Sequence, residues 1–216
     1  MAYKILFIDE EKSQHDLFQN YMDAAPDDMV VKCLFPESDI NAMIAKIDEE
    51  HPDAIVADYL LNDMKTDVNY NISYNGVELL TAYRTMRPNF PCFVLTSYDD
   101  DAVCDTDDVN LIYVKSLLTK EDSNIKSRFY NKVYSQTQKY RGSIIDAQSE
   151  LKSLLEKRVA GSISLQEEQR LIDLDDFLEK SLDSYHAIPK EMKELSNLKN
   201  IATLIDKVDD LLKKFN

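Results

Sequence analysis

Glycine, cysteine and tryptophan are scarce in this chain of 216 residues, which contains three glycines, three cysteines and no tryptophan. So few glycines leave no Gly-rich loop of the kind that cradles nucleotide phosphates. The cysteines are odd in number and lack the spacing of a zinc site. We therefore expect Cys33 and Cys92, which lie in apolar runs, to be reduced thiols of the core.

Long apolar runs are also missing. No stretch approaches the roughly 18 residues that a membrane-spanning helix needs, and Met1–Asp9 is too short and too acidic for a signal peptide. Hydrophobic residues nevertheless make up 44% of the chain, which is enough for a packed core. We therefore expect a folded cytoplasmic protein without a membrane partner.

Positive charge is scarce in the first half of the chain only. Residues 1–116 contain 8 Lys and Arg against 23 Asp and Glu, whereas residues 117–216 contain 17 of each. The net charge of −15 therefore lies entirely in the first part, and we place a domain boundary near residue 117. Nucleic-acid phosphates repel an acidic surface, and a neutral second part supplies no basic patch. The charge count thus predicts no nucleic-acid partner.

Short apolar runs alternate with amphipathic segments in residues 1–116. We predict strands at Tyr3–Ile8, Met29–Phe35, Ala54–Ala57, Phe93–Leu95 and Leu111–Val114. We predict helices at Ser13–Ala25, from a Ser38 cap to about Glu50, and at Gly76–Arg87. Strands that are apolar throughout, with helices between them, indicate a doubly wound α/β fold whose parallel sheet is covered on both faces.

Polar residues follow these strands directly, at the edge of the sheet where such folds hold their sites. They are Asp9, Glu10, Asp58, Thr96, Ser97 and Lys115. Three carboxylates at one edge repel each other unless a cation neutralises them, and an all-oxygen ligand set suits Mg²⁺. Lys115 and Thr96 supply a cation and a hydroxyl donor for a phosphoryl group attacked by Asp58.

The pattern resembles the receiver domains of response regulators. The matching stretches are Lys4–Glu10, Pro52–Asp58, Asn75–Leu80, Phe93–Ser97 and Ile112–Lys115, and the resemblance covers residues 1–116. It implies a flavodoxin-like fold in which Asp58 accepts a phosphoryl group from the phosphohistidine of a histidine kinase. It also implies that Thr96 and Lys115 contact that group, and that Mg²⁺ is held by Asp9, Glu10, Asp58 and the backbone carbonyl of Leu60.

Four features depart from the family pattern. Glu10 stands where the family usually has an aspartate, Ile112 where it has an aromatic residue, and Ser116 where it has a proline. The segment Leu61–Tyr74 is longer than the usual loop, and we expect it to act as a lid or a docking loop. These departures keep a second interpretation open, in which the domain is a degenerate receiver that is never phosphorylated.

The second half, residues 117–216, shows helical periodicity and resembles no family known to us. We predict one long helix from about Ser123 to Lys157, a second that follows a capping box at Ser164–Glu167, and a third after Pro189. Their apolar stripes need a bundle or coiled-coil-like packing. We expect this region to dock a protein partner or a second copy of the chain.

Together these features predict a two-component response regulator rather than an independent enzyme, because no second catalytic set is visible. Its expected partners are a histidine kinase or phosphotransfer protein and an unknown protein that the helical half binds. The alternative from a different class is an adaptor or scaffold that uses the degenerate receiver without phosphorylation.

Overall fold

The computed structural model describes residues 2–23, 25, 28–62, 67–97, 112–119 and 123–182. The chain divides into two compact units, Met1–Gly142 and Ser143–Asn216. In the part of the chain that is described, no helix combines the length and the apolar character needed to cross a membrane.

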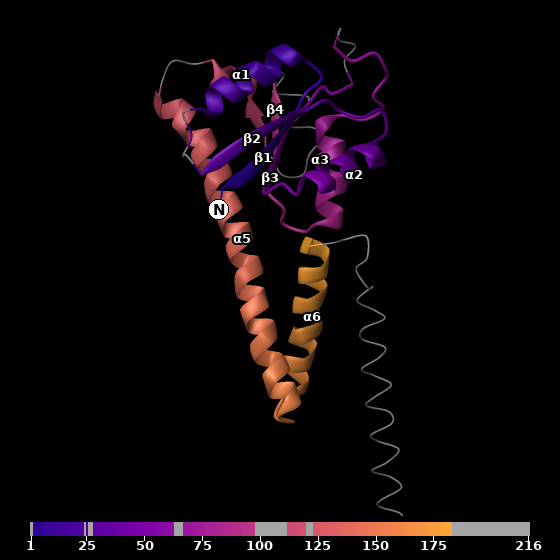
Figure 1. The fold of residues 1–216 in the computed structure, drawn as a ribbon, viewed down its shortest axis with the longest axis vertical. Coiled ribbons are helices and arrows are strands. Elements are labelled where there is room, and N and C mark those ends of the chain that lie inside the picture. The colour runs from indigo at the N-terminus through magenta and orange to yellow at the C-terminus, as the bar shows by residue number, and fades with distance from the viewer. Residues whose placement is uncertain are drawn as a thin grey trace, which may run out of the picture. The chain divides into compact units, whose positions relative to one another are not determined.

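The first unit is built on a parallel sheet of five strands (Figure 1). The strands are β1 (Tyr3–Ile8), β2 (Met29–Leu34), β3 (Ala54–Asp58), β4 (Cys92–Thr96) and β5 (Ile112–Val114). Their order is β2-β1-β3-β4-β5, and all four pairings are parallel. The predicted α/β class and parallel sheet are therefore confirmed. Strands β3 and β4 are buried along their whole length, which explains their continuous apolar sequence.

Helices cover both faces of this sheet (Figure 1). Helix α1 (Lys12–Met22) packs on one face together with α5 (Ser123–Val159), while α2 (Ile40–Glu50) and α3 (Gly76–Met86) lie on the other. The predicted Ser38 cap of α2 is wrong by one residue. The side chain of Asp39 accepts hydrogen bonds from the backbone amides of Asn41 and Ala42 instead.

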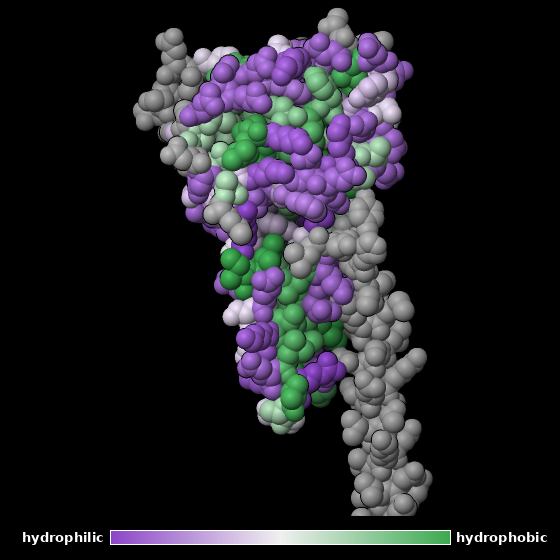
Figure 2. Space-filling view, in the orientation of Figure 1, coloured by the Kyte–Doolittle hydropathy of each residue, from purple (hydrophilic) through white to green (hydrophobic). Residues whose placement is uncertain are grey.

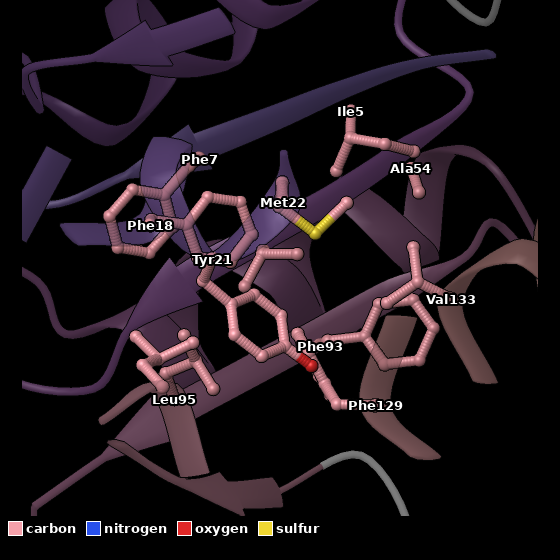
Figure 3. Close-up of a cluster of buried hydrophobic side chains, with 12 residues drawn as sticks. Ile5, Phe7, Phe18, Tyr21, Met22, Ala54, Phe93, Leu95, Phe129 and Val133 are labelled. Atoms are coloured by element: carbon pink, nitrogen blue, oxygen red, sulfur yellow. The ribbon is translucent and has the colours of Figure 1, made fainter. Parts of the chain in front are cut away.

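The core between the sheet, α1 and α5 is rich in aromatic side chains (Figure 3). Phe7 stacks on Phe18 of α1 with ring centroids 4.2 Å apart. Phe93 of β4 meets Phe129 of α5 edge to face at 6.0 Å. Cys92 is buried in the sheet and Cys33 is half-buried, and both are free thiols, as predicted.

The beginning of α5 belongs to the first unit. Phe129 and Val133 are almost fully buried in the sheet core. Farther along the helix, the guanidinium of Arg141 lies 4.4 Å from the ring centre of Tyr3 and donates two hydrogen bonds of 2.8 Å to the Asp53 carboxylate. The boundary placed near residue 117 precedes all of these contacts, whereas the compact unit extends to Gly142.

The second unit pairs the last part of α5 with α6 (Leu165–Leu182). The helices meet through a small aliphatic core of Ala147, Leu154, Leu171, Leu174 and Leu178. Gly161, with φ of 68°, turns the chain, and the predicted capping box forms between Ser164 and Glu167. Figure 2 shows hydrophobic side chains running along this helix pair. The predicted third helix lies outside the described residues.

If the first part of α5 is integral to the sheet unit, Phe129→Ala should lower the free energy of unfolding by about 3–5 kcal/mol, the usual cost of emptying a buried aromatic site. Ile145→Ala is the matched control, because Ile145 lies on the same helix but is 62% exposed. It should change the free energy of unfolding by less than about 0.5 kcal/mol. Urea titrations monitored by circular dichroism measure both, and equal effects would contradict the assignment.

Candidate functional site

The strand register brings the predicted polar residues to one edge of the sheet. Ile8 at the end of β1 pairs with Ala57 of β3, so Asp9 and Asp58 follow neighbouring strand positions. Asp58 in turn pairs with Leu95, the residue before Thr96. Lys115 comes directly after the last residue of β5. Parallel strands end on the same side, which is why these distant residues meet.

Three acidic side chains form a tight buried cluster at this edge. Ligand oxygens of Asp9, Glu10 and Asp58 all lie within 4.8 Å of one another. The three residues are 0%, 2% and 4% exposed. Carboxylates that lie this close together and are shielded from water repel each other strongly unless a positive charge is nearby.

Lys115 supplies one such charge. Its ammonium group lies 2.9 Å from Oδ2 of Asp9 and 3.0 Å from Oδ1 of Asp58. Burial alone lowers the pKa of Lys115, but the carboxylates of Asp58 and Asp9 more than reverse this, so its pKa is raised. Lys115 is therefore a cation at any physiological pH and bridges two of the three acids.

One lysine does not neutralise three acids, and the carboxyl pKa values show the imbalance. Burial, followed by the neighbouring charge of Asp9, raises the pKa of Glu10 to about 8. Burial also raises the pKa of Asp58 to about 6, despite the opposing charge of Lys115. The pKa of Asp9 is raised by burial as well. The cluster thus favours uptake of protons or of a further cation.

The donor set fits a hard divalent ion. All three groups offer oxygen ligands, which Mg²⁺ prefers. The Oε2 atom of Glu10 is buried and has no hydrogen-bond partner among the residues that the structure describes. A buried oxygen without a partner is costly, and a metal ion would satisfy it. Leu60 lies two residues after Asp58 and is half-buried, and its carbonyl stays a predicted ligand.

Thr96 ends β4 as a fully buried residue, and its contact with a phosphoryl group stays a prediction. The Tyr113 ring packs against Phe93 and Phe129, with centroids 6.1 and 4.8 Å away. The aromatic ring of β5 therefore belongs to the core on the α1 and α5 face of the sheet.

His15 is a site neighbour that the sequence did not reveal. It is buried on α1 between the rings of Phe7 and Phe35. Its Nε2 lies 2.9 Å from the carbonyl oxygen of Asp9, so this nitrogen must carry the proton that it donates. Burial lowers the pKa of His15, which keeps the ring neutral. No periodicity or motif distinguishes such a histidine from an ordinary helix residue.

Gly76 explains why the Asn75–Gly76 pair lies next to Asp58. Gly76 begins α3, and its amide donates to the carbonyl of Tyr59 at 2.9 Å. A Cβ atom on Gly76 would lie only 2.0 Å from the carbonyl oxygen of Asp58. Asn75 caps the helix in a reciprocal box with Glu78. The start of α3 is thus pressed against the end of β3, where no side chain fits.

Gly76→Ala should therefore push β3 and α3 apart at Asp58 and lower the free energy of unfolding by about 1–3 kcal/mol, the range for overpacked sites. Gly142→Ala is the control, because a Cβ atom there meets nothing within 4 Å. It lies within a helix, where alanine is favoured over glycine by about 0.5–1 kcal/mol. Opposite signs in denaturant titrations support the close approach, and a neutral Gly76→Ala would contradict it.

The raised carboxyl pKa values predict that the metal-free protein loses stability as pH rises. A carboxyl whose pKa is higher in the folded state contributes stability below its unfolded pKa, and this is lost as pH rises through the folded value. For Asp58 and Glu10 these folded values are about 6 and about 8. Each unit of pKa difference corresponds to about 1.4 kcal/mol.

The range from pH 7 to 9 spans the pKa of about 8 of Glu10, whereas the lowered pKa of His15 has its opposite effect only below the ordinary histidine value of 6.5. Melting temperatures in a chelator should fall across this range for the wild type. Glu10→Gln should flatten the profile, since its amide does not titrate. A wild-type profile that is already flat would show that Glu10 is not a strained buried acid.

Of the comparisons with known proteins, the one with solved structures gives matches. No model of a protein family matches the chain, and no curated protein is detectably similar to it. The isolated receiver domain of RcsB from Salmonella enterica serovar Typhimurium, solved with the phosphomimetic BeF3−, is 17% identical over 54% of this chain and 79% of that one, with a TM-score of 0.40. The receiver domain of NtrC is 18% identical over 64% of this chain and 97% of that one, with a TM-score of 0.43.

A further comparison corrects one prediction. The RcsB–DNA complex is 14% identical to this chain over 88% of its length and 100% of the RcsB chain, with a TM-score of 0.42. The prediction that the chain has no nucleic-acid partner was wrong as an exclusion, because a similar structure is solved on DNA. The physical reason is that net charge sums over a whole unit, whereas DNA binding depends on the local placement of basic groups.

The fold assignment rests on the strand topology of the first unit. A parallel sheet of order β2-β1-β3-β4-β5 is the flavodoxin-like arrangement. The acidic residues lie where this arrangement holds its sites, outside the carboxyl ends of β1 and β3. The first unit therefore has the flavodoxin-like fold that the resemblance to receiver domains implies.

Proposed function

We propose that this chain is a two-component response regulator whose receiver unit accepts a phosphoryl group on Asp58, with Mg²⁺ as its cofactor. The observation that carries the proposal is the convergence of Asp9, Glu10, Asp58 and Lys115 at one buried edge. An acidic cluster alone would be ambiguous. Its combination with a bridging lysine and a neighbouring threonine matches the needs of phosphoryl transfer to a carboxylate.

Asp58 is the nucleophile in this proposal. With a pKa of about 6 it is mainly a carboxylate at neutral pH. One of its oxygens attacks the phosphorus of a phosphohistidine on a histidine kinase or phosphotransfer protein. A phosphorus–oxygen bond forms while the phosphorus–nitrogen bond breaks, and the electron pair of that bond stays on the imidazole nitrogen. The product is an aspartyl phosphate on this chain.

Asp9, Glu10 and Asp58 would hold the metal ion, with the carbonyl of Leu60 as the further predicted ligand. When bound, Mg²⁺ supplies positive charge that offsets the repulsion between the Asp58 carboxylate and the incoming phosphoryl oxygens. The buried Oε2 of Glu10, which has no hydrogen-bond partner among the described residues, would then gain one. Glu10 is longer than aspartate by one methylene group, so its carboxylate can reach an ion that lies farther from its own backbone.

Lys115 connects the site to the helices. In the unphosphorylated protein it contacts Asp9 and Asp58, and phosphoryl oxygens on Asp58 would compete for it. Lys115 begins a short 3-10 helix, η2 (Lys115–Leu118), and Leu118 is buried in the same cluster as Phe129 of α5. A shift of Lys115 toward the phosphoryl group therefore alters the packing under α5, which supports a role for the helical half in output.

The output that we propose is contact with a protein partner through the helical half. Large hydrophobic side chains there are exposed, namely Ile145, Leu155, Val159 and Leu165. Large apolar side chains exposed in this number on one helix pair are candidate contacts for a partner.

A second candidate function is an adaptor that is never phosphorylated. It is favoured by Lys115, which already bridges two of the carboxylates without any ligand, and by the replacement of the family's usual aspartate by Glu10. In this function the acids and the lysine would be a structural ion network. The two candidates differ in one measurable outcome, the appearance of a phosphoryl adduct.

We expect the wild type to gain one phosphoryl group in intact-mass spectra after incubation with acetyl phosphate and Mg²⁺. The adduct should be absent in a chelator, because the repulsion at Asp58 is then unrelieved. Asp58→Asn should abolish it, since an amide is a poor nucleophile for phosphorus. Lys115→Met should reduce uptake by on the order of a hundredfold, the usual effect of removing one electrostatic contact to a reacting centre.

Asp53→Asn is the matched control for these variants. Asp53 is also an aspartate of the third strand region, but it lies at the opposite end of β3 and binds Arg141. It should keep full phosphoryl uptake. A wild-type spectrum without an adduct, under both acetyl phosphate and a panel of phosphorylated histidine kinases, would favour the adaptor.

A further inference from the structure

The loop between β3 and α3 lies across a neighbouring loop at the site edge of the sheet. Its side chains donate three hydrogen bonds to consecutive carbonyls that follow β2. The hydroxyl of Tyr70 donates to Pro36 at 2.6 Å, that of Tyr74 to Glu37 at 2.7 Å, and that of Ser73 to Ser38 at 3.4 Å. Three such bonds to consecutive residues fix the course of the loop. Because the acceptors are backbone carbonyls, the bonds do not depend on the side chains of Pro36, Glu37 and Ser38.

Buried side chains anchor the same segment. Tyr74 is 3% exposed and Ile72 is 9% exposed. Burial, followed by the charge of Glu37, raises the pKa of Tyr74. The phenol therefore stays protonated and keeps its hydrogen bond over the whole physiological range. Residues 67–74 form an ordered strap, and we use this name for them below.

The strap also reaches the first turn of α1. The Oδ2 atom of Asp67 accepts a hydrogen bond of 3.1 Å from the backbone amide of Lys12, the first residue of that helix. The N-cap residue of α1 is Glu11, whose side chain makes no capping bond to the helix. Amides in the first turn of a helix need an acceptor from outside it. Asp67 provides one from 55 positions away in the sequence.

Lys12 ends the turn that presents the acidic pair. The start of the turn is fixed by His15, which donates to the Asp9 carbonyl at 2.9 Å, and by the Glu11 amide, which donates to Asp9 Oδ1 at 2.9 Å. Both of these bonds hold Asp9. The bond from Lys12 to Asp67 ties the far side of the turn to another element.

We propose that Asp67 is a positioning residue for the acidic cluster. By capping α1 from the strap, it fixes the turn after Glu10 and keeps the Glu10 carboxylate aimed at Asp9 and Asp58. It thereby sets the affinity of the cluster for a divalent cation. This inference rests on the proposed function, in which the cluster holds Mg²⁺.

Glu10 is the ligand that needs this support most. A glutamate has one more rotatable bond than an aspartate, so more freedom is lost when it binds an ion. Its Oε2 atom is buried without a protein partner in the described part of the chain, so no hydrogen bond of its own holds that oxygen in place. Groups outside the ligand shell that orient ligands commonly change metal affinity by about 10–100-fold.

Two variants of Asp67 separate position from charge. Asp67→Ala removes both the acceptor and the negative charge, whereas Asp67→Asn removes the charge but keeps a capping oxygen. Isothermal titration calorimetry of the full chain with MgCl2 measures the affinity, and melting temperatures in a chelator report stability. We expect about tenfold weaker Mg²⁺ binding for Asp67→Ala and an affinity close to wild type for Asp67→Asn.

Asp39→Ala is the matched control for a purely structural role. Asp39 caps α2 through the amides of Asn41 and Ala42, and its loss should lower the melting temperature without weakening Mg²⁺ binding. If Asp67→Ala lowers only the melting temperature, the inference is overturned. If Asp67→Asn binds Mg²⁺ as weakly as Asp67→Ala, the effect is electrostatic and positioning is likewise refuted. A wild type that binds no Mg²⁺ at all would overturn the proposed metal site itself.

Discussion

The contact of the Lys115 ammonium with Asp9 and Asp58 is the constraint on which the arrangement of the first unit depends. It joins the ends of β1, β3 and β5, three strands that are far apart in sequence, through bonds of 2.9 and 3.0 Å. Parallel strands are held in register by their side-chain alternation, and a slip of one residue moves every side chain to the opposite face. A slip of β3 would carry Asp58 away from the lysine and leave buried charges without partners. The charge cluster and the strand register therefore enforce each other.

The charges of this cluster do not balance, because it contains three acidic side chains and one lysine. The raised pKa values of Glu10 and Asp58 express that imbalance as a tendency to take up positive charge. A site with balanced charges would be more stable, but it would gain less from binding a cation. Stability given up at a binding site is a common consequence of selection for function. The hydrophobic core beneath, with Phe7, Phe18 and Phe93 almost completely buried, is what makes this loss tolerable.

The sequence predicted those parts of the fold and site that depend on local pattern. Buried parallel strands read as apolar runs, so their ends could be located, and with them Asp9, Asp58 and Lys115. Contacts between distant segments left no local signal: His15 beneath Asp9, Gly76 against the Asp58 carbonyl, and Asp67 on Lys12 each join residues through tertiary packing alone. The charge count was less informative. It wrongly excluded nucleic acid, because a sum of charges does not report where basic groups gather on the surface.

The periodicity of helix α5 could not predict which part of it packs on the sheet and which part packs on α6. Its buried positions, from Phe129 and Val133 through Tyr140 to Ala147 and Leu154, recur at steps of four and seven residues and keep to one face of a single helix. The partner of that face nevertheless changes. Up to Arg141 its contacts are with the sheet and its aromatic core, and from Ile144 onward with α6. The stripe is unbroken because both partners need the same apolar face. The change of partner coincides with Gly142, the last residue of the first unit, where the helix carries its least favourable residue and no side chain. Bending therefore costs less at that position than elsewhere in α5.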